Sequence, residues 1–153
     1  MNAHNANYVI VAGVDGSDGG HRALRWAAHE AARRGGTVQA VAAWRWDDES
    51  TLSQEELRRR AEDVLSQEIA ALAPGLPVAG QVIEGRPADA LTTAAHGADL
   101  LVLGSHGHSR VWHTVLGSVA QECISKATCP VVVIPVPEQA ARPAAPPAVV
   151  SRS

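Results

Sequence analysis

Residues 8–20 read YVIVAGVDGSDGG, an apolar run from Tyr8 to Val14 that passes directly into a glycine-rich turn. The run is apolar throughout and does not alternate with polar residues, which is typical of a central parallel strand covered by helices on both faces. After the turn, apolar residues recur at helical spacing from Ala23 to Ala31, and Gly35-Gly36 follows. This stretch therefore predicts a strand, a tight turn and an amphipathic helix that ends at the glycine pair.

The same alternation of short apolar runs and longer amphipathic segments continues along the chain. Runs rich in apolar and β-branched residues predict further strands over residues 37–44, 77–84, 99–103 and 130–135. Helical spacing predicts helices that begin at the capping box Ser53-x-x-Glu56, extend from Ala88 to about His96, and extend from Val115 to Ala127. Strands that alternate with helices are the pattern of βαβ units, so we expect a single-domain α/β fold with an open parallel sheet and helices on both faces. The 77–84 run is less apolar than the others, which favours an edge strand.

Length and composition set the boundaries of this domain. A chain of 153 residues is long enough to bury one core. We expect the domain to occupy residues 8–136, after a flexible N-terminus over residues 1–7. Residues 137–153 are rich in Pro and Ala and have no apolar period. They predict a disordered tail, because they cannot bury enough surface to offset the entropy lost on ordering.

Composition also narrows the partners and the compartment. The formal net charge of -3 gives no electrostatic reason to expect nucleic acid or an anionic membrane as a partner. No apolar run approaches the ~20 residues of a transmembrane helix, and the start MNAHNANYVIV lacks the basic segment and cleavage site of a signal peptide. We therefore expect a cytoplasmic protein. The spacing of Cys123 and Cys129 matches neither a CxxC redox pair nor half of a zinc site, which favours two reduced packing thiols.

The most informative stretch is a glycine-rich loop, GSHGHSRVWHTVLGS over residues 104–118, between the 99–103 strand and the last helix. Glycines after a parallel strand allow positive φ angles and let backbone N–H groups approach a phosphate without a Cβ in the way. Gly117 and Ser118 would open the helix, so its unpaired amides and the positive end of its dipole would point to the same place. Phosphate fits such a site; the alternative is a flexible loop that ends in a Gly-Ser helix cap.

The spacing G-x2-G-x9-G-[ST], carried here by Gly104, Gly107 and Gly117-Ser118, resembles the ATP-binding branch of the universal stress protein family. Further matching segments span nearly the whole core: Val14 to Ser17, Gly85-x-Pro87, Ala98 to Ser105 and Cys129 to Ile134. The resemblance implies a Rossmann-like, five-stranded parallel sheet of order 3-2-1-4-5. In that order the first and fourth strands flank the point where strand order reverses, and ligands bind at the carboxyl ends of strands there.

The resemblance also implies which residues hold the nucleotide. Gly13, Val14 and Asp15 would lie against the adenosine, and Ala43 would help to form the adenine slot. Ribose and the first phosphates would be held by Gly104, Ser105 and Gly107, and the terminal phosphates by Gly117, Ser118 and Val119. ATP is the implied ligand, with Mg²⁺ or Mn²⁺ on its phosphates. Gly13 and Ala43 are smaller than the family's usual residues, which predicts weaker adenine packing. As a carboxylate just after a strand, Asp15 has the alternative role of capping the next helix.

Other side chains of the loop have more than one interpretation. His106, His108 and His113 could form a metal site or a pH-sensitive phosphate clamp, but loop histidines without an acidic partner more often face solvent. Arg110 could pair with a phosphate or lie on the surface. Trp112 could cover the nucleotide or anchor the loop by hydrophobic contact.

The functional expectation is a nucleotide-dependent regulatory module. The sequence has no GK[ST] lysine, no evident general base and no arginine finger, so fast ATP hydrolysis is not expected. Instead, ATP would order the loop from His106 to Leu116 and change a surface that an unknown downstream protein reads during a stress response. The alternatives are a slow ATPase or autophosphorylating protein, with Ser118 as a candidate acceptor, and a nucleotide-independent dimeric module. The apolar strand from Val131 to Ile134 predicts a homodimer, because members of the family commonly pair through it.

Two other nucleotide or phosphate folds fit the sequence less well. A response-regulator receiver needs an Asp after its third strand and a Lys after its fifth, whereas Glu84-Gly85 and Pro135 stand at those positions. A flavodoxin-like domain needs a hydroxyl-rich turn after its first strand, whereas Asp15 would place a carboxylate where the FMN phosphate lies.

Overall fold

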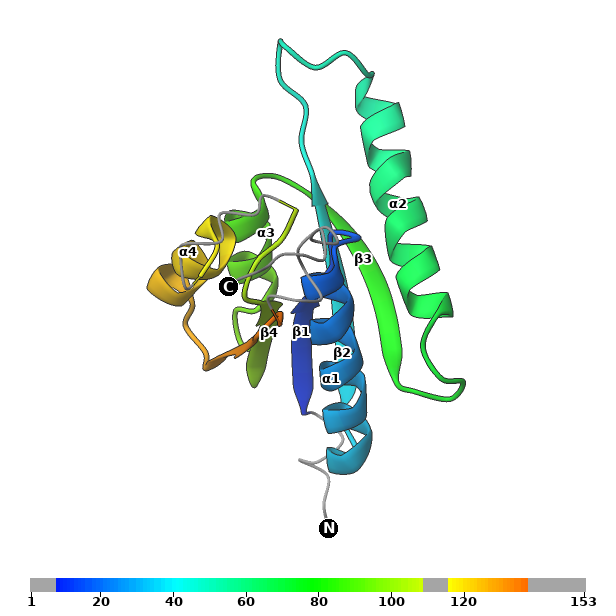
Figure 1. Cartoon of the computed structure of the whole chain (residues 1–153), viewed down its shortest axis with the longest axis vertical. Coiled ribbons are helices and arrows are strands. Elements are labelled where there is room, and N and C mark those ends of the chain that lie inside the picture. The colour runs from blue at the N-terminus through cyan, green and yellow to red at the C-terminus, as the bar shows by residue number, and fades with distance from the viewer. Residues whose placement is uncertain (1–7, 109–115, 138–153) are drawn as a thin grey trace, which may run out of the picture.

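The computed structural model describes residues 8–108 and 116–137, which form one layered α/β domain (Figure 1). Strands and helices alternate along the chain as the sequence predicts. The elements are β1 (Val9–Gly13), α1 (Asp18–Arg34), β2 (Thr37–Trp44), α2 (Gln54–Ala70), β3 (Val78–Glu84), α3 (Pro87–Ala94), β4 (Leu100–Gly104), α4 (Ser118–Lys126) and β5 (Val131–Ile134).

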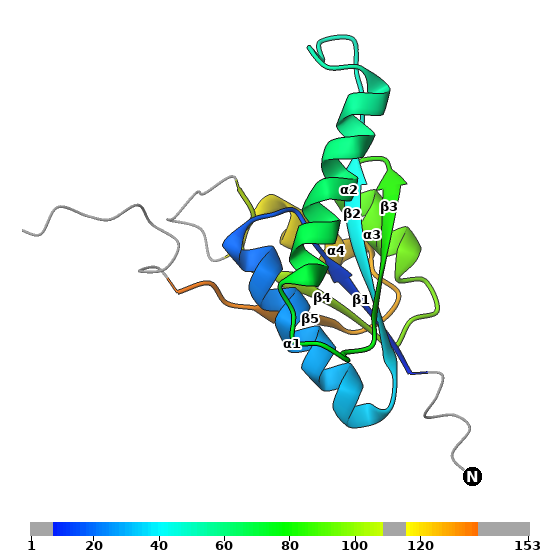
Figure 2. The ribbon, with the colours of Figure 1, turned by 90° about the vertical axis from the view of Figure 1, so that its right-hand side faces the viewer.

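The sheet is five-stranded and parallel, in the order β3-β2-β1-β4-β5, so the topology implied by the resemblance is confirmed. Helices α1 and α2 cover one face, and α3 and α4 cover the other (Figure 2). The central strand β1 supplies both cores: Ile10 and Ala12 point to the side of α1 and α2, and Val11 points to the side of α3 and α4. This two-sided burial is why the first run has no polar alternation.

The helix ends follow the predicted local signals. Helix α1 ends at Gly35, whose φ of 69° is left-handed and whose N–H donates to the Ala31 carbonyl. Helix α2 begins with the complete capping box of Ser53 and Glu56. The N-cap of α1 is Ser17, whose hydroxyl accepts from the Gly20 N–H at 3.1 Å. The alternative role of Asp15 as the cap is therefore wrong: its Oδ1 accepts from the N–H and hydroxyl of Ser17, and Ser17 is the residue that caps the helix.

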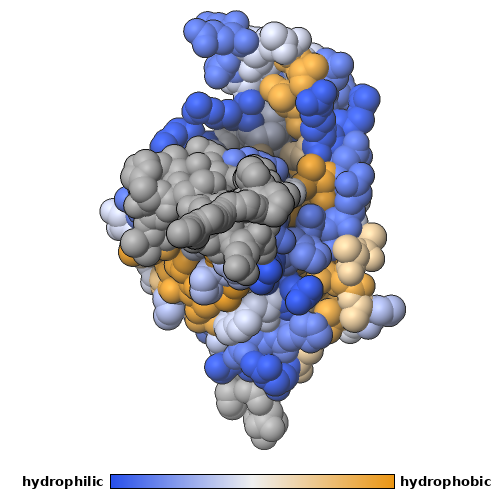
Figure 3. Space-filling model, viewed as in Figure 1, coloured by the Kyte–Doolittle hydropathy of each residue, from blue (hydrophilic) through white to orange (hydrophobic). Residues whose placement is uncertain are grey.

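The two edges of the sheet differ in character. At β3, Ala79, Gly80 and Gln81 are exposed, as expected for the less apolar run. At the opposite edge every residue of β5 is only half-buried. In Figure 3 hydrophobic side chains, drawn in orange, gather over the region where β5 runs in Figure 1.

Several predictions concern residues that the structure leaves undescribed. The flexible N-terminus over residues 1–7 lies outside the described residues, as does the tail over residues 137–153 apart from Pro137.

Cys123 is buried, Cys129 is half-buried, and both are free thiols. Within residues 8–108 and 116–137, none of the helices has the length and apolar character needed to span a bilayer.

Candidate functional site

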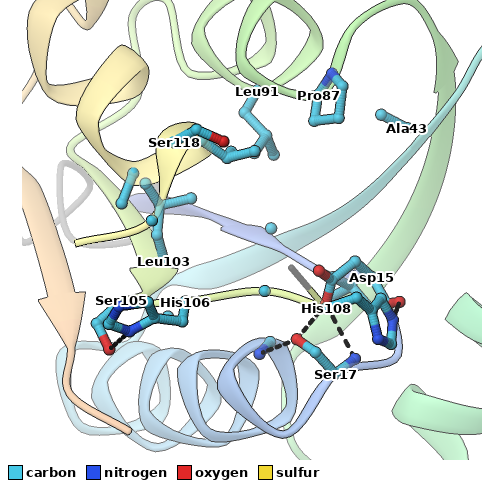
Figure 4. Close-up of a pocket in the computed structure, with 18 of the residues that line it drawn as sticks. Asp15, Ser17, Ala43, Pro87, Leu91, Leu103, Ser105, His106, His108 and Ser118 are labelled. Carbon is cyan, nitrogen blue, oxygen red and sulfur yellow. Dashed lines mark hydrogen bonds between the residues drawn. The ribbon is translucent and has the colours of Figure 1, made fainter. Parts of the chain in front are cut away.

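A pocket of about 170 Å³ lies at the carboxyl ends of β1 and β4, where the strand order reverses (Figure 4). The loop after β1 and the loop after β4 both line the pocket, and they contact each other where His108 meets Asp15. Residues from the first turns of α3 and α4 and from the end of β2 complete the lining. This is the position at which open α/β sheets bind ligands, because adjacent loops diverge to opposite faces of the sheet there.

Every residue that the resemblance assigns to the site lines this one pocket. The β1 end contributes Gly13, Val14 and Asp15, and β2 contributes Ala43; the loop after β4 contributes Gly104, Ser105 and Gly107, and the start of α4 contributes Gly117, Ser118 and Val119. The structure therefore brings together segments that are more than a hundred residues apart in sequence. The role of each residue toward a nucleotide stays a prediction.

Asp15 and Ser17 form the polar wall on the β1 side. The Ser17 N–H and hydroxyl donate to Asp15 Oδ1 at 3.0 and 2.5 Å. The same hydroxyl accepts from the Gly20 N–H and so caps α1. The Asp15 carboxylate is consequently held by the turn that starts the helix, while the residue itself remains exposed at the pocket.

The glycines of the loop after β4 allow close backbone approach, but none of them adopts a left-handed conformation. A Cβ on Gly104 would lie 2.5–2.7 Å from main-chain atoms of Gly19, and a Cβ on Gly107 would lie 2.7 Å from Asp15 Oδ2. Gly117 has a φ of -72°, and positive φ angles near the pocket occur instead at Gly16 and Gly85. The expectation that the motif glycines supply positive φ is thus wrong. Gly104 and Gly107 are needed because their backbones lie against α1 and against the Asp15 carboxylate, whereas Gly117 has room for a Cβ.

Helix α4 points its N-terminus into the pocket. It begins at Ser118, with Gly117 as an N-cap that makes no side-chain capping hydrogen bond. The predicted opening of the helix at Gly117-Ser118 is confirmed, whereas the apolar spacing from Val115 placed its start one turn too early. The Gly117 N–H is itself paired with the Ser105 carbonyl at 2.7 Å. The amides of the first helical turn therefore lie at the pocket wall, where a helix terminus favours an anion.

The opposite part of the pocket is apolar, and sequence reasoning missed most of it. Its walls come from β2, α3 and β4: Val41, Pro87, Leu91 and Leu103 lie around Ala43 and the adjoining backbone. The signal for Pro87 was present in Gly85-x-Pro87, and Leu91 follows one helical turn later on the same face of α3. Other lining residues that the sequence interpretation did not assign are Ser17, Gly20, His106, His108 and Ala120.

Two of the three loop histidines can be placed. His106 Nδ1 lies 3.2 Å from the Ser105 hydroxyl, and His108 Nε2 lies 2.6 Å from the main-chain oxygen of Asp15. His113 and the other loop candidates, Arg110 and Trp112, fall outside the described residues. Among residues 8–108 and 116–137, no cluster of three or more His, Cys, Asp or Glu side chains is arranged to hold a metal ion.

A charged cluster braces α3 against α4 beside the pocket. Arg86 donates to Glu122 at 3.0 Å, and Lys126 donates to Asp89 at 2.8 Å. The hydrogen bond from Arg86, followed by that from Lys126, holds the pKa of Glu122 below its usual range. The hydrogen bond from Lys126 does the same for the pKa of Asp89. Because these side chains are partly exposed to solvent, each ion pair should contribute only modestly to the free energy of unfolding.

Known proteins resemble the chain in sequence over most of its length. Residues 8–135 match the family model described as the universal stress protein family. The chain is 30% identical over 174 residues to a universal stress protein of Mycobacterium tuberculosis (strain CDC 1551 / Oshkosh), covering 98% of this chain and 55% of that protein. It is 34% identical over 132 residues to a universal stress protein of Thermus aquaticus, covering 82% of this chain and 96% of that protein. The chain therefore spans about half the length of the mycobacterial relatives that it matches.

Solved structures with nucleotides resemble the fold as well. A universal stress protein in complex with cAMP superimposes with a TM-score of 0.65 at 25% identity, covering 84% of this chain and 97% of that chain. The universal stress protein from Archaeoglobus fulgidus in complex with dAMP gives a TM-score of 0.54 at 27% identity, with the same coverage of the two chains. The family match, the sequence relatives and the shared strand order agree, and the chain belongs to the universal stress protein family.

Proposed function

We propose that this chain binds an adenine nucleotide in the pocket between β1 and β4, and that the physiological ligand is ATP with Mg²⁺. The observation that carries the proposal is the pairing, in one pocket, of an apolar slot with the open N-terminus of α4. The base of a nucleotide needs an apolar slot, and its phosphates need the free amides of a helix N-terminus. The cAMP and dAMP complexes of relatives support the same ligand class.

Each end of the pocket suits one part of the ligand. Ala43, Pro87 and Leu91 line an apolar part of the pocket that would take the base, and the Asp15 carboxylate lines the same pocket as a hydrogen-bond acceptor. The amides of Ser118 and Val119 face the phosphate end. Mg²⁺ bound to a nucleotide takes its ligands largely from phosphate oxygens and water, so it does not require an acidic cluster from the protein.

Nucleotide occupancy would act as a regulatory signal. The phosphate end of the pocket is formed by residues on both sides of the loop 109–115, so phosphates bound there would bias the conformation of that loop. A downstream protein would read the resulting surface. We propose the cytoplasm as the site of action.

Calorimetry on a variant that fills the base slot tests the proposal. Wild-type protein is titrated with ATP in magnesium, and Ala43→Leu is compared with Ala79→Leu, which adds the same side chain on exposed β3 away from the pocket. Ala43→Leu should weaken binding about tenfold or more, because overpacking costs about 1–3 kcal/mol, and Ala79→Leu should bind as wild type does. No binding by the wild type, or equal binding by both variants, would refute the site.

A slow ATPase or autophosphorylating activity is the second candidate, favoured by one observation. The Ser118 side chain is exposed at the phosphate end of the pocket, where its hydroxyl could accept a phosphoryl group. Incubation with γ-labelled ATP followed by intact mass measurement separates the candidates. An added phosphate that is absent from Ser118→Ala supports transfer, whereas unmodified protein with no released phosphate leaves the regulatory function.

A homodimer through β5 is also proposed. The strand is half-buried in the isolated chain and hydrogen-bonds along one side to β4, so its outer edge is available for pairing. Val133 belongs to neither core cluster, and Val133→Lys should therefore yield a folded monomer in light scattering, where the wild type is a dimer. A wild-type monomer at micromolar concentration would refute the dimer and leave the nucleotide site untouched. A nucleotide-independent dimeric module would instead dimerise without binding ATP.

A further inference from the structure

His108 connects the two loops that form the mouth of the pocket. It follows Gly107 in the loop after β4, and its Nε2 lies 2.6 Å from the main-chain oxygen of Asp15 in the loop after β1 (Figure 4). A carbonyl oxygen only accepts hydrogen bonds, so Nε2 carries the proton and donates. His108 and Asp15 are 93 residues apart in sequence, and neither belongs to a strand or a helix. This hydrogen bond therefore joins the two loops directly.

The bonded carbonyl belongs to the residue whose side chain enters the pocket. Asp15 Oδ1 is held by the Ser17 N–H and hydroxyl. The next residue, Gly16, has a φ of 82°, and a Cβ built there would lie 3.4 Å from Val64 Cγ1 of α2 and 3.7 Å from His108 Nε2. Asp15 is therefore held at two places: Ser17, in the same turn, binds its carboxylate, and His108, from the loop after β4, binds its main-chain oxygen.

Gly107 makes the same crossing tight. A Cβ at Gly107 would lie 2.7 Å from Asp15 Oδ2, so the backbone of one loop lies against the carboxylate of the other. The hydrogen bond of His108 and the contact of Gly107 thus act on the two ends of one residue. Together they set both the orientation of the Asp15 peptide and the direction of its side chain.

We propose that His108 is a positioning residue that latches the loop after β4 onto the Asp15 turn and so orients the Asp15 carboxylate for ligand binding. The ligand part of this inference rests on the proposed nucleotide site. His108 acts here through its N–H donor, which is present in both the neutral and the protonated ring. Its effect is consequently independent of its charge.

The competing role is direct attraction between a protonated His108 and phosphate. Asp15 and His106 are the other titratable residues lining this part of the pocket. A charge role predicts stronger binding at low pH and a larger effect on ATP than on AMP. A latch predicts neither, and it predicts that a neutral donor of similar length can replace the histidine.

The experiment compares His108→Gln, which keeps an N–H donor without the charge, with His108→Ala and with a matched control, His29→Ala on the exposed face of α1. Binding of ATP and of AMP is measured by calorimetry at about pH 6 and about pH 8, on either side of the usual histidine pKa. His108→Ala should bind both nucleotides about five- to tenfold more weakly, the net worth of one hydrogen bond. His108→Gln and His29→Ala should stay within about twofold of wild type at both pH values.

Hydrogen exchange of the free protein gives a readout that needs no ligand. The Ser17 amide, which donates to Asp15, should exchange faster in His108→Ala and at the wild-type rate in His108→Gln. The Val14 amide, bonded to the Val41 carbonyl within the sheet, serves as the internal reference.

The two readouts separate failure of the latch from failure of the site. Faster Ser17 exchange in a protein that binds no nucleotide would support the latch and refute the nucleotide site. Unchanged exchange and affinity in His108→Ala would overturn the latch, and so would a loss in His108→Gln, relative to wild type, that is confined to ATP and deepens at low pH.

Discussion

Adding one methyl group at Gly104 should separate the packing role of the loop glycines from their proposed ligand role. Gly104 ends β4 directly against the first turn of α1. The Cβ of Gly104→Ala would lie 2.5 Å from the Gly19 carbonyl carbon, 2.6 Å from its oxygen and 2.7 Å from its Cα. All three are main-chain atoms, so no side chain can turn away, and α1 would have to move by roughly 1 Å to restore ordinary contact distances.

The cost of that movement should be large because α1 is fixed at its start and along its length. Ser17 caps the helix, and Ala23 and Leu24 are fully buried against the sheet. We therefore expect Gly104→Ala to lose about 3 kcal/mol, at the upper end of the range for overpacked cores. For a domain of this size that corresponds to a melting temperature roughly 10 °C lower.

Urea unfolding followed by tryptophan fluorescence measures the loss, since Trp26 and Trp44 pack against the core. Gly117→Ala is the matched control: its Cβ would come no closer than 3.3 Å to the Ser105 oxygen, and its φ of -72° suits alanine. It should cost about 1 kcal/mol or less, the penalty for alanine at an N-cap. Equal unfolding midpoints for Gly104→Ala and wild type would refute the packing argument, above all if nucleotide affinity fell at the same time.

Three further predictions concern other parts of the chain. Ser53→Ala removes the capping box of α2 and should lower the free energy of unfolding by about 1 kcal/mol in urea titrations; no change would mean that the first turn of α2 is already frayed. Burial raises the pKa of the Cys123 thiol to about 11, and the pKa of Cys129 is raised by burial as well, so native protein at about pH 8 should be alkylated at Cys129 well before Cys123 in peptide mass spectra; the reverse order would contradict the packing of α4. The hydrogen bond from Arg86 lowers the pKa of Glu122, so the ionised Glu122 stabilises the fold above the ordinary glutamate pKa, and this stabilisation is lost as pH falls through the lowered pKa. Wild type and Glu122→Gln should therefore differ in urea midpoint at about pH 6 and converge toward about pH 3. A difference that stays constant with pH would assign the effect to packing.

The fold was predictable from sequence wherever a local signal sets a boundary. The strand over residues 37–44 and the start of α2 at the Ser53 capping box agree with the structure because both depend on neighbouring residues. The order of the strands in the sheet, in contrast, does not depend on neighbouring residues. An apolar run such as that of β1 says that the strand is central, but not which strands flank it, since those contacts depend on how the later crossovers wind. The order 3-2-1-4-5 came from the resemblance.

The site was predictable to the same depth. The glycine spacing located the pocket, because the loops after β1 and β4 must meet once the strands are adjacent. The glycine spacing did not reveal Pro87 and Leu91, because whether they line the pocket depends on where α3 packs on the sheet. It also gave the wrong reason for Gly104: the expected positive φ is a property of one residue, whereas the observed contact with Gly19 involves two residues distant in sequence.

The same atoms hold the fold together and form the candidate site, and this decides which variants can test function. Ser105 makes three such hydrogen bonds. Its carbonyl accepts from the Gly117 N–H, and its N–H donates to the Ile134 carbonyl at the end of β5. The Ser105 hydroxyl accepts from the Val136 N–H. A substitution at Ser105 or Gly104 would therefore disturb α4, β5 and the pocket at once, and a lost affinity there would not identify a ligand contact. Ala43 is different because it lines the pocket from a half-exposed strand end and lies outside both buried core clusters. Nucleotide binding is best tested at such positions, and the motif glycines are best tested for stability first.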